Sequence, residues 1–262
     1  MQPSFNLEGR VAVVTGGGGG LGAMACEALA RAGATVAIRA GATVAIVGRD
    51  AGKCEAVRQT LAAEGGQCRT FLADITSEDE VKRLFAEVAA EFGGVDILVN
   101  NAGVTSPKAF LDLDVSDWDR IMDTSAKGTF LCTRAVAPLM QARGGGRIVN
   151  LGSILSERGI VNRSAYSAAN AAVVNLTRPT AIKLGPMGIR VNAIGPTVIV
   201  TDLNRELVVT QPALYKSIVD RTPLGRLGET ADLTGPLFFL ASYASAFVTG
   251  QILYVDGGYT AS

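Results

Sequence analysis

The stretch TGGGGGLG, residues 15–22, follows an apolar run at 11–14 and precedes a segment of helical length. Glycines at 16, 20 and 22 let the backbone turn sharply, approach a pyrophosphate closely and pack a helix on a strand. Free amides at the start of that helix would face the anion. A glycine run alone is also typical of a flexible turn, but its place between strand and helix favours a nucleotide loop. We expect four loop residues to contact the nucleotide: Gly16, Gly20, Leu21 and Gly22.

Apolar runs rich in Val and Ile recur along the chain, and the segments between them carry apolar residues three and four positions apart. This alternation predicts βαβ units and a parallel sheet with helices on both faces. No linker or change of composition divides the chain, so we expect a single domain over residues 1–262. The strands are expected at 11–14, 44–47, 97–99, 147–151, 189–194 and 252–255.

Helix signals accompany the expected strands. Ser77 with Glu80, and Ser116 with Asp119, have the spacing of an N-cap and its third helical residue. Gly33 and Gly93 stand where helices would end. The acidic run LDLDVSDWD at 111–119 is therefore predicted to be a loop and a capped helix start, and we expect no metal site there.

Residues 31–46 read RAGATVAI twice in succession. Both copies cannot be the same strand. The second copy runs into Gly48, Arg49 and Asp50, which resembles a strand that ends at a cofactor pocket, so we assign the strand to it. The first copy is then an insertion in the preceding helix or loop, at a modest entropic cost. The competing register pairs the first copy and lets the second bulge out.

Composition excludes several classes of function. The chain has 262 residues, with 24 Lys plus Arg and 24 Asp plus Glu, so no net charge attracts nucleic acid or an anionic membrane. No long apolar run or charged leader is present, so we expect a cytoplasmic protein. Histidine is absent, which excludes His-dependent triads. The four cysteines lack CxxC spacing and are expected to be free thiols.

Arg49 occupies the position that discriminates between dinucleotides. It lies 27 residues after Gly22, and removing the eight duplicated residues leaves 19. An acidic residue about 20 positions after the loop holds the ribose diol of NAD, whereas a basic one accommodates the extra phosphate of NADP. The sequence therefore favours NADP(H), with NAD(H) as the alternative. Arg49 as a solvated loop charge is the other interpretation.

Seven motifs follow one another along the chain: TGGGGGLG at 15–22, Asp74 in FLADIT, NNAG at 100–103, Ser153 in NLGS, Tyr166 in YSAAN, IRVNAIGP at 189–196 and VDGG at 255–258. In order and content they resemble the motifs of the short-chain dehydrogenase/reductase family over essentially the whole chain. Among the branches of that family, the chain looks most like gluconate 5-dehydrogenase and 3-oxoacyl carrier-protein reductase.

The resemblance implies a Rossmann-type, doubly wound sheet of about seven strands, a homotetramer, and hydride transfer between a nicotinamide and a small-molecule alcohol or ketone. It implies that Ser153 hydrogen-bonds the substrate oxygen and that Tyr166 transfers its proton. The segment 198–227 would form a lid, and the C-terminal VDGGYTAS would pack between subunits. The implied cofactor contacts are Asp74 at the adenine, Asn101 and Gly103 along the cofactor, and Ile194 and Thr201 near the nicotinamide carboxamide.

Two of the four catalytic positions depart from the family pattern. The lysine of YxxxK is Asn170, and the helix asparagine is Ser125. A tyrosine has a pKa near 10, and a cation about 4 Å away would favour its phenolate by roughly 4 kcal/mol at an effective dielectric of 20. Asparagine supplies no such charge. We therefore expect slow turnover, with alcohol oxidation impaired more than carbonyl reduction.

Two alternatives remain at this point. The chain is either a weakened oxidoreductase or a catalytically dead nucleotide-binding protein with a binding or assembly role. Near the expected site, Arg158 or Arg163 could steer an acidic substrate. The other interpretation of these two arginines is that they are solvated loop charges.

Overall fold

In the computed structural model, which describes residues 4–31, 42–202 and 204–262, seven strands form one parallel sheet. The strand order is β3-β2-β1-β4-β5-β6-β9, so the chain winds outward in both directions from β1 and β4. This confirms the predicted Rossmann-type α/β fold. The strands are β1 Val11–Thr15, β2 Thr43–Gly48, β3 Cys68–Leu72, β4 Ile97–Asn100, β5 Gly146–Leu151, β6 Ile189–Pro196 and β9 Ile252–Val255, with β7 Ile199–Val200 and β8 Gly228–Glu229 in a separate small sheet.

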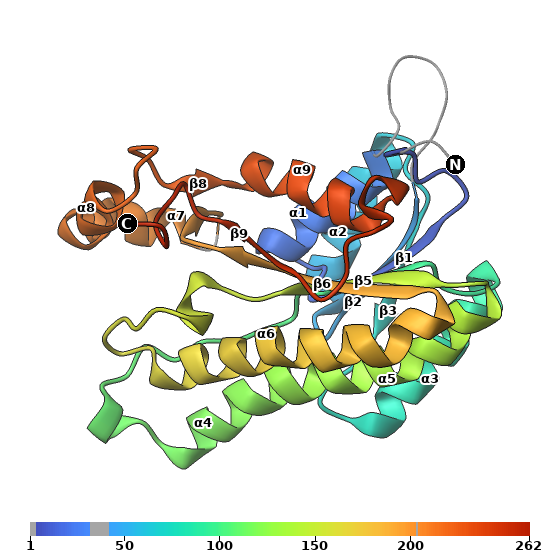
Figure 1. Cartoon of the computed structure of the whole chain (residues 1–262), viewed down its shortest axis with the longest axis horizontal. Coiled ribbons are helices and arrows are strands. Elements are labelled where there is room, and N and C mark those ends of the chain that lie inside the picture. The colour runs from blue at the N-terminus through green and yellow to red at the C-terminus, as the bar shows by residue number, and fades with distance from the viewer. Residues whose placement is uncertain (1–3, 32–41, 203) are drawn as a thin grey trace.

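Helices cover both faces of the sheet (Figure 1), with α1, α2 and α9 on one face and α3, α5 and α6 on the other. The helices are α1 Gly20–Arg31, α2 Ala51–Ala63, α3 Glu78–Phe92, α4 Val115–Met122, α5 Gly128–Ala142, α6 Ser164–Leu184, α7 Arg205–Thr210, α8 Pro212–Asp220 and α9 Thr230–Ala241. Short helical turns are η1 Phe110–Asp112, the π-helical η2 Asp123–Lys127, η3 Ile154–Ser156, η4 Gly185–Met187 and η5 Tyr243–Ser245.

The side chains of β1 alternate between two apolar clusters. Ala12 and Val14 pack on the side of α1 and α9, whereas Val11 and Val13 pack on the side of α3 and α5. Successive side chains of a strand point to opposite faces, so a strand covered on both faces is apolar throughout. This arrangement explains why the expected strands appeared as uninterrupted apolar runs in the sequence.

The second copy of the repeat forms β2, as predicted. Thr43 pairs with Val11 of β1, and Val44 pairs with both Ala12 of β1 and Cys68 of β3. The competing register, in which the first copy pairs, is therefore wrong. The first copy from its second residue onward, and the expected helix end at Gly33, lie outside the described residues.

The cap predictions had mixed outcomes. The Ser77 hydroxyl accepts a hydrogen bond from the Glu80 amide, and Gly93 ends α3 in the left-handed conformation, as predicted. The N-cap at Ser116 is wrong, because α4 already begins at Val115. Its cap residue, Asp114, makes no side-chain cap bond, and its carboxylate instead binds the Lys108 ammonium at 2.6 Å.

Three further features complete the description of the fold. Figure 1 shows α7 and α8 close together at one end of the molecule, near the C-terminus. Within the described part of the chain, no helix combines the length and the apolar character needed to cross a membrane. The four cysteines are free thiols, and Cys68 is the one that is only half-buried.

Candidate functional site

The glycine loop joins β1 to α1 and is held in place by Asn101. Gly16 and Gly20 have positive φ angles of 66° and 54°, which favour glycine. The Asn101 amide group donates to the carbonyl oxygens of Thr15 and Gly16, at 3.0 and 3.2 Å. A Cβ on Gly22 would overlap the Gly16 carbonyl oxygen. The loop thus needs glycine at these positions because the turn is tight and the chain crosses itself closely.

The start of α1 offers backbone amides to an anion. Gly17 donates to Val47 of β2, and Gly22 and Ala23 donate to Gly19. Within residues 4–31, 42–202 and 204–262, the amides between these donors have no hydrogen-bond acceptor. Unpaired N–H groups at a helix start form an anion site, to which the helix dipole adds. A dinucleotide pyrophosphate fits this loop, and the free amides belong to Gly18, Gly19, Gly20 and Leu21.

Arg49 and Asp74 lie beside each other at the ends of β2 and β3. The Arg49 guanidinium is 3.7 Å from the Asp74 carboxylate, and its side chain is 65% exposed. Burial of Asp74 acts to raise its pKa, but hydrogen bonds from Thr76 and the charge of Arg49 lower it on balance. Asp74 is therefore ionised at neutral pH. Most of the Arg49 side chain remains exposed and available to bind a second anion.

Ser153 and Tyr166 come together from β5 and α6. Ser153 is buried, and its hydroxyl oxygen accepts a hydrogen bond from the Leu155 amide at 3.1 Å. Because that oxygen is already an acceptor, the hydroxyl proton remains available to donate to a substrate oxygen. The Tyr166 ring packs with Ile154 and Leu155, and its hydroxyl is close enough to Ser153 for the serine to affect its pKa.

Asn170 lies on the same face of α6, one turn beyond Tyr166, and only 5% of its surface is exposed. Its amide nitrogen donates to the main-chain carbonyl of Tyr166 at 2.8 Å. Burial raises the pKa of the Tyr166 phenol. The Asn170 side chain and the charge of Arg163 oppose that rise without reversing it. The phenol is therefore a proton donor at neutral pH and a poor base.

Ser125 lies in η2, the π-helical turn between α4 and α5, and is buried. A Cβ on Gly103 would lie 3.4 Å from the Ser125 hydroxyl oxygen, so the two residues are neighbours. Such π-turns occur often at functional sites. The turn before α5 therefore lies against the loop after β4, at Ser125 and Gly103.

Ile194 and Thr201 come from the end of β6 and the segment after it. The Ile194 carbonyl accepts from the Gly152 amide at 2.8 Å, which places it next to Ser153. The Thr201 amide donates to the Asn204 side chain at 2.8 Å. The candidate cofactor residues therefore lie at the carboxyl ends of strands or after them, where open α/β sheets bind their ligands.

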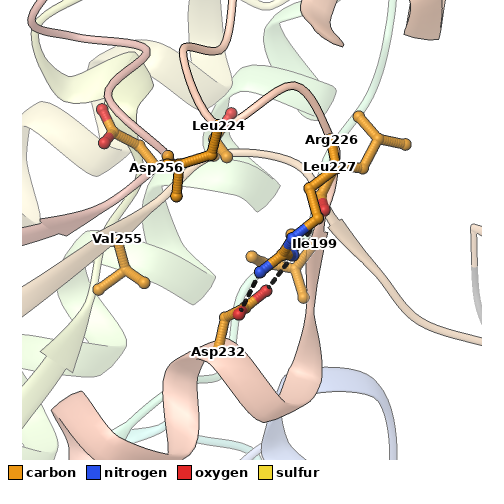
Figure 2. Close-up of a pocket in the computed structure, with 10 residues that line it drawn as sticks. Ile199, Leu224, Arg226, Leu227, Asp232, Val255 and Asp256 are labelled. Carbon is orange, nitrogen blue, oxygen red and sulfur yellow. Dashed lines mark hydrogen bonds and ion pairs between the residues drawn. The ribbon is translucent and has the colours of Figure 1, made fainter.

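A cavity of about 140 Å³ lies next to this edge (Figure 2), between the segment after β6, the loop before β8 and the end of β9. Arg226 and Asp232 form two hydrogen bonds beside it, at 2.7 and 2.8 Å. The Thr197 hydroxyl is buried there without a partner among the described residues. None of the four candidate catalytic residues lines this cavity.

The sequence reasoning missed the polar residues that hold this edge together. The Thr15 hydroxyl accepts from the amides of Asn101 and Ala102, at 3.1 and 3.2 Å. Deeper in the core, the Asn100 amide donates to Asn150 at 2.9 Å, and Asn150 donates to Thr177 at 3.0 Å. Asparagine at the end of an apolar strand was the available signal, because a buried amide requires a partner.

The fold and this edge define a Rossmann-type nucleotide-binding protein with a serine and a tyrosine beside the nucleotide loop. The sequence matches the family model described as enoyl-(acyl carrier protein) reductase over residues 22–260. The chain belongs to the short-chain dehydrogenase/reductase family. The predicted resemblance is thereby confirmed.

Curated relatives match nearly the full length. Cis-4-hydroxycyclohexanecarboxylate dehydrogenase of Sinomonas cyclohexanicum is 42% identical over 257 residues, covering 96% of this chain and 97% of the relative. Gluconate 5-dehydrogenase of Gluconobacter oxydans is 36% identical over 258 residues, covering 98% and 97%. These relatives are dehydrogenases, so the chain is similar to enzymes of that type along its whole length.

Solved structures show the same fold. A gluconate 5-dehydrogenase from Burkholderia cenocepacia, in complex with NADP and tartrate, superposes with a TM-score of 0.92 at 35% identity, covering 99% of this chain and 98% of that one. A 7α-hydroxysteroid dehydrogenase complexed with NADH and 7-oxo glycochenodeoxycholic acid has a TM-score of 0.89 at 35% identity, covering 97% and 96%. Both nicotinamide dinucleotides therefore occur among proteins of this fold.

Proposed function

We propose that the chain is an NADP(H)-dependent oxidoreductase that interconverts a carbonyl and an alcohol on a small molecule, and that it turns over slowly. The observation that carries this proposal is the pairing of Ser153 with Tyr166 at the sheet edge that holds the glycine loop. The reduced rate follows from Asn170, which places a neutral amide where the family pattern has a cation.

In reduction, the Tyr166 hydroxyl donates its proton to the carbonyl oxygen, while the Ser153 hydroxyl donates a hydrogen bond to the same oxygen. Both groups then act on the oxygen that gains negative charge. In oxidation, Tyr166 must accept a proton and therefore must first be a phenolate. Its raised pKa makes the phenolate scarce at neutral pH, so oxidation is impaired more than reduction.

Residues of the described edge would hold the dinucleotide. The amides from Gly18 to Leu21 would donate hydrogen bonds to the pyrophosphate, Asp74 would border the adenine, and Asn101, Gly103, Ile194 and Thr201 would line the path toward Tyr166. When bound, the nicotinamide supplies or accepts the hydride. Arg49 favours NADP(H), because its guanidinium is largely exposed and can bind an additional phosphate.

The substrate is expected to carry a carboxylate. Two relatives named above act on hydroxy acids, and the Burkholderia structure contains tartrate, which also bears carboxylates. We infer that the segment at about 198–227, of which the structure describes all but residue 203, forms a lid over the substrate. Tyr215 and Ile218 of α8 belong to the same apolar cluster as Tyr166, which supports this role.

The first experiment separates binding from chemistry. Calorimetric titration with NADPH and NADH measures cofactor binding, and NADPH oxidation with neutral and acidic ketones measures turnover. We expect binding together with slow, substrate-dependent oxidation of NADPH. Absence of heat with both dinucleotides would contradict the proposal at its foundation.

The cofactor preference has its own test. Replacing Arg49→Ala should weaken NADPH binding by about tenfold or more, because a charged contact to phosphate is lost, while NADH binding stays within about threefold. Lys82→Ala on α3 serves as the control, since it removes an exposed positive charge elsewhere. An equal loss for both dinucleotides would show that Arg49 does not discriminate.

The second candidate function is a nucleotide-binding protein that has lost the chemistry and acts in binding or assembly. Asn170 and Ser125 favour it, since both replace residues of the family's catalytic set. Tight NADPH binding without oxidation of NADPH by any ketone, in the native chain and in a variant with lysine at position 170, would support it.

Each chain is expected to form a single domain over residues 1–262 and to be located in the cytoplasm. Four copies of the chain are expected to form a homotetramer. Large apolar side chains lie exposed on the side of α4, α5 and α6, which supports subunit contacts there. Light scattering coupled to size exclusion tests the expected mass. The exposed residues are Phe110, Leu111, Val115, Phe130 and Ile182.

A further inference from the structure

Arg163 precedes the helix that carries Tyr166. It is the residue before α6, one helical turn ahead of the tyrosine, and its carbonyl accepts from the Ser167 amide at 2.8 Å. Its guanidinium donates to the hydroxyl of Thr105 at 2.9 Å. Thr105 follows Gly103 by two residues in the loop after β4. The guanidinium therefore lies between the start of α6 and the loop that borders the candidate site.

Most other cations in the segments bordering Tyr166 are neutralised by carboxylates. Lys108 binds Asp114 and Asp117, at 2.6 and 2.7 Å. In the lid segment, Lys216 pairs with Asp220 and Arg226 with Asp232. Among the described residues, no carboxylate pairs with Arg163. The side-chain partner that Arg163 has in this part of the chain is a neutral hydroxyl, which is a weaker acceptor for a guanidinium than a carboxylate is.

Two further arginines in these segments, Arg158 and Arg221, also lack a carboxylate partner among the described residues, but they contact the C-terminal segment. Arg158 donates to the carbonyl oxygen of Thr260, and Arg221 stacks on the ring of Tyr259 at 4.5 Å. Both are thus engaged with the C-terminal segment. Arg163 differs because its charge reaches the Tyr166 phenol, where it acts to lower the pKa.

We propose that Arg163 determines substrate specificity by binding a carboxylate on the substrate while the substrate's carbonyl or hydroxyl group lies at Tyr166 and Ser153. The inference rests on the proposed function and assigns its substrate recognition to a residue. A guanidinium matches a carboxylate with two parallel hydrogen bonds, which fixes orientation as well as supplying affinity. The carboxylate would take the place of the Thr105 hydroxyl or share the guanidinium with it.

The charge of Arg163 has a second consequence. An uncompensated cation near the phenol stabilises the phenolate through its charge, whereas the Asn170 side chain contributes a hydrogen bond and no charge. When a neutral substrate occupies the site, Arg163 is therefore the group whose positive charge favours proton acceptance by Tyr166. Removing that charge should move the rise in oxidation of a neutral alcohol to higher pH, an effect that a purely structural role of Arg163 would not produce.

The test compares two substrates that differ in charge at one position, 4-oxocyclohexanecarboxylate and its methyl ester, in the native chain and in three variants. Arg163→Gln should lower kcat/KM for the acid by about 10- to 100-fold and change it for the ester by less than about threefold. Arg163→Lys should retain an intermediate preference for the acid. Arg158→Gln, in the same loop, should leave the preference unchanged.

Equal losses for acid and ester in Arg163→Gln, or no loss for the acid, would overturn the inference. A binding measurement keeps it testable if turnover is too slow to follow. Cyclohexanecarboxylate and cyclohexanecarboxamide are titrated into protein saturated with NADP. The native chain should bind the carboxylate more tightly than the amide, and Arg163→Gln should bind both alike. Equal binding of the carboxylate by the two proteins refutes the role of Arg163.

The two proposals fail in different ways. If the native chain reduces the ester as efficiently as the acid, the oxidoreductase assignment stands and the role of Arg163 is wrong. If neither compound is reduced but the carboxylate binds through Arg163, the carboxylate site stands and the oxidoreductase assignment is wrong.

Discussion

The side-chain amide of Asn170 donates a hydrogen bond to the main-chain carbonyl oxygen of Tyr166 at 2.8 Å. This contact ties the amide to the backbone of α6, a bond that short polar side chains often make in helices. An ammonium group at the same position would instead place a full positive charge in a buried environment beside the phenol. The difference between amide and ammonium therefore sets the protonation state of Tyr166.

Replacing Asn170→Lys should raise the rate of NADP-dependent alcohol oxidation at pH 7.5 by about 100-fold or more. The added charge lowers the pKa of Tyr166 and restores a general acid/base contribution of about 10² to 10⁴. Initial rates at saturating cofactor provide the measurement. Asn170→Met is the matched control, because methionine is similar in length to lysine and carries no charge. This variant should give no gain in rate.

A gain of equal size in Asn170→Met would attribute the effect to packing instead of charge. No gain in Asn170→Lys, in protein that still binds NADPH, would show that Tyr166 does not limit the rate.

The native chain should oxidise alcohols faster as pH rises, by about tenfold per pH unit between pH 7 and 9. Because burial raises the pKa of Tyr166, phenolate makes up less than about one part in a thousand at pH 7. Carbonyl reduction uses the protonated phenol and should stay nearly constant over this range. Rates in both directions, measured at constant ionic strength, check this prediction.

The raised pKa of Tyr166 also determines how this residue affects stability as pH changes. The folded state retains the phenolic proton more tightly than the unfolded state does, so Tyr166 lowers stability only as pH rises above the unfolded pKa of about 10. Below pH 9 the tyrosine is protonated in both states. A flat oxidation rate from pH 7 to 9 would therefore contradict the role of Tyr166 and could not be explained by its effect on folding.

Much of the sheet was predictable because its central strands are buried on both faces. The runs that became β1, β2 and β4 are apolar at every central position. By contrast, β3 was missed. It is an edge strand in which Phe71 is buried while Arg69 and Leu72 are exposed, so it has no apolar run to recognise. A strand pattern weakens in this way where a neighbour is missing on one side.

The residues of the site were predictable where they form short motifs, and their contacts were not. Arg49 and Asp74 were assigned to separate parts of the cofactor, yet they lie 3.7 Å apart across two strand ends. The Arg163 contact with Thr105 joins residues 58 positions apart. Such contacts depend on the order of strands in the sheet, which no local pattern contains.

A glycine-to-alanine substitution should have a large effect in the tight turn of the glycine loop and a small effect at its open tip. A Cβ on Gly22 would overlap the Gly16 carbonyl oxygen, whereas one on Gly19 would meet no atom within 4 Å. Gly22→Ala should weaken NADPH binding by about tenfold or more or prevent folding, since interior overlaps cost about 1 to 3 kcal/mol or more. Gly19→Ala should retain the fold, measured by circular dichroism and thermal melting.

Calorimetry with NADPH supplies the second measurement for this pair. Similar affinities in Gly22→Ala and Gly19→Ala would mean that the loop relaxes freely, which would remove the argument that its tight turn positions the amides.

The amino-terminal ends of β5 and β6, which lie away from the candidate site, carry an excess of buried positive charge. Arg147 is only 7% exposed and lies over the ring of Tyr243 at 4.3 Å. Arg190 donates to main-chain carbonyls there, including that of Ser242 at 2.7 Å, and its pKa is lowered to about 10 by burial and by the charge of Arg147. Among the described residues, no carboxylate pairs with Arg147 or Arg190. Asp96 is nearby but already binds Arg10 and Arg143.

A carboxylate at position 243 should therefore stabilise the fold. The hydrogen bond from Arg147 lowers the pKa of Tyr243, which shows that this position favours negative charge. Tyr243→Asp should raise the free energy of unfolding at pH 7 by about 1 kcal/mol, or the Tm by about 2–4 °C, because the ion pair outweighs the two cation–π contacts that are lost, with Arg10 and Arg147. Tyr243→Phe, which keeps the ring and removes the hydroxyl, should lower the Tm slightly.

The gain from Tyr243→Asp should depend on pH in one direction. Beside the arginines, the new carboxyl would have a folded pKa below its unfolded value near 3.9, so its stabilisation is complete above about pH 5 and is lost as pH falls toward the folded pKa. Melting curves from pH 3 to 8 measure this dependence. A lower Tm for Tyr243→Asp at pH 7 would mean that burying the carboxylate costs more than pairing Arg147 returns.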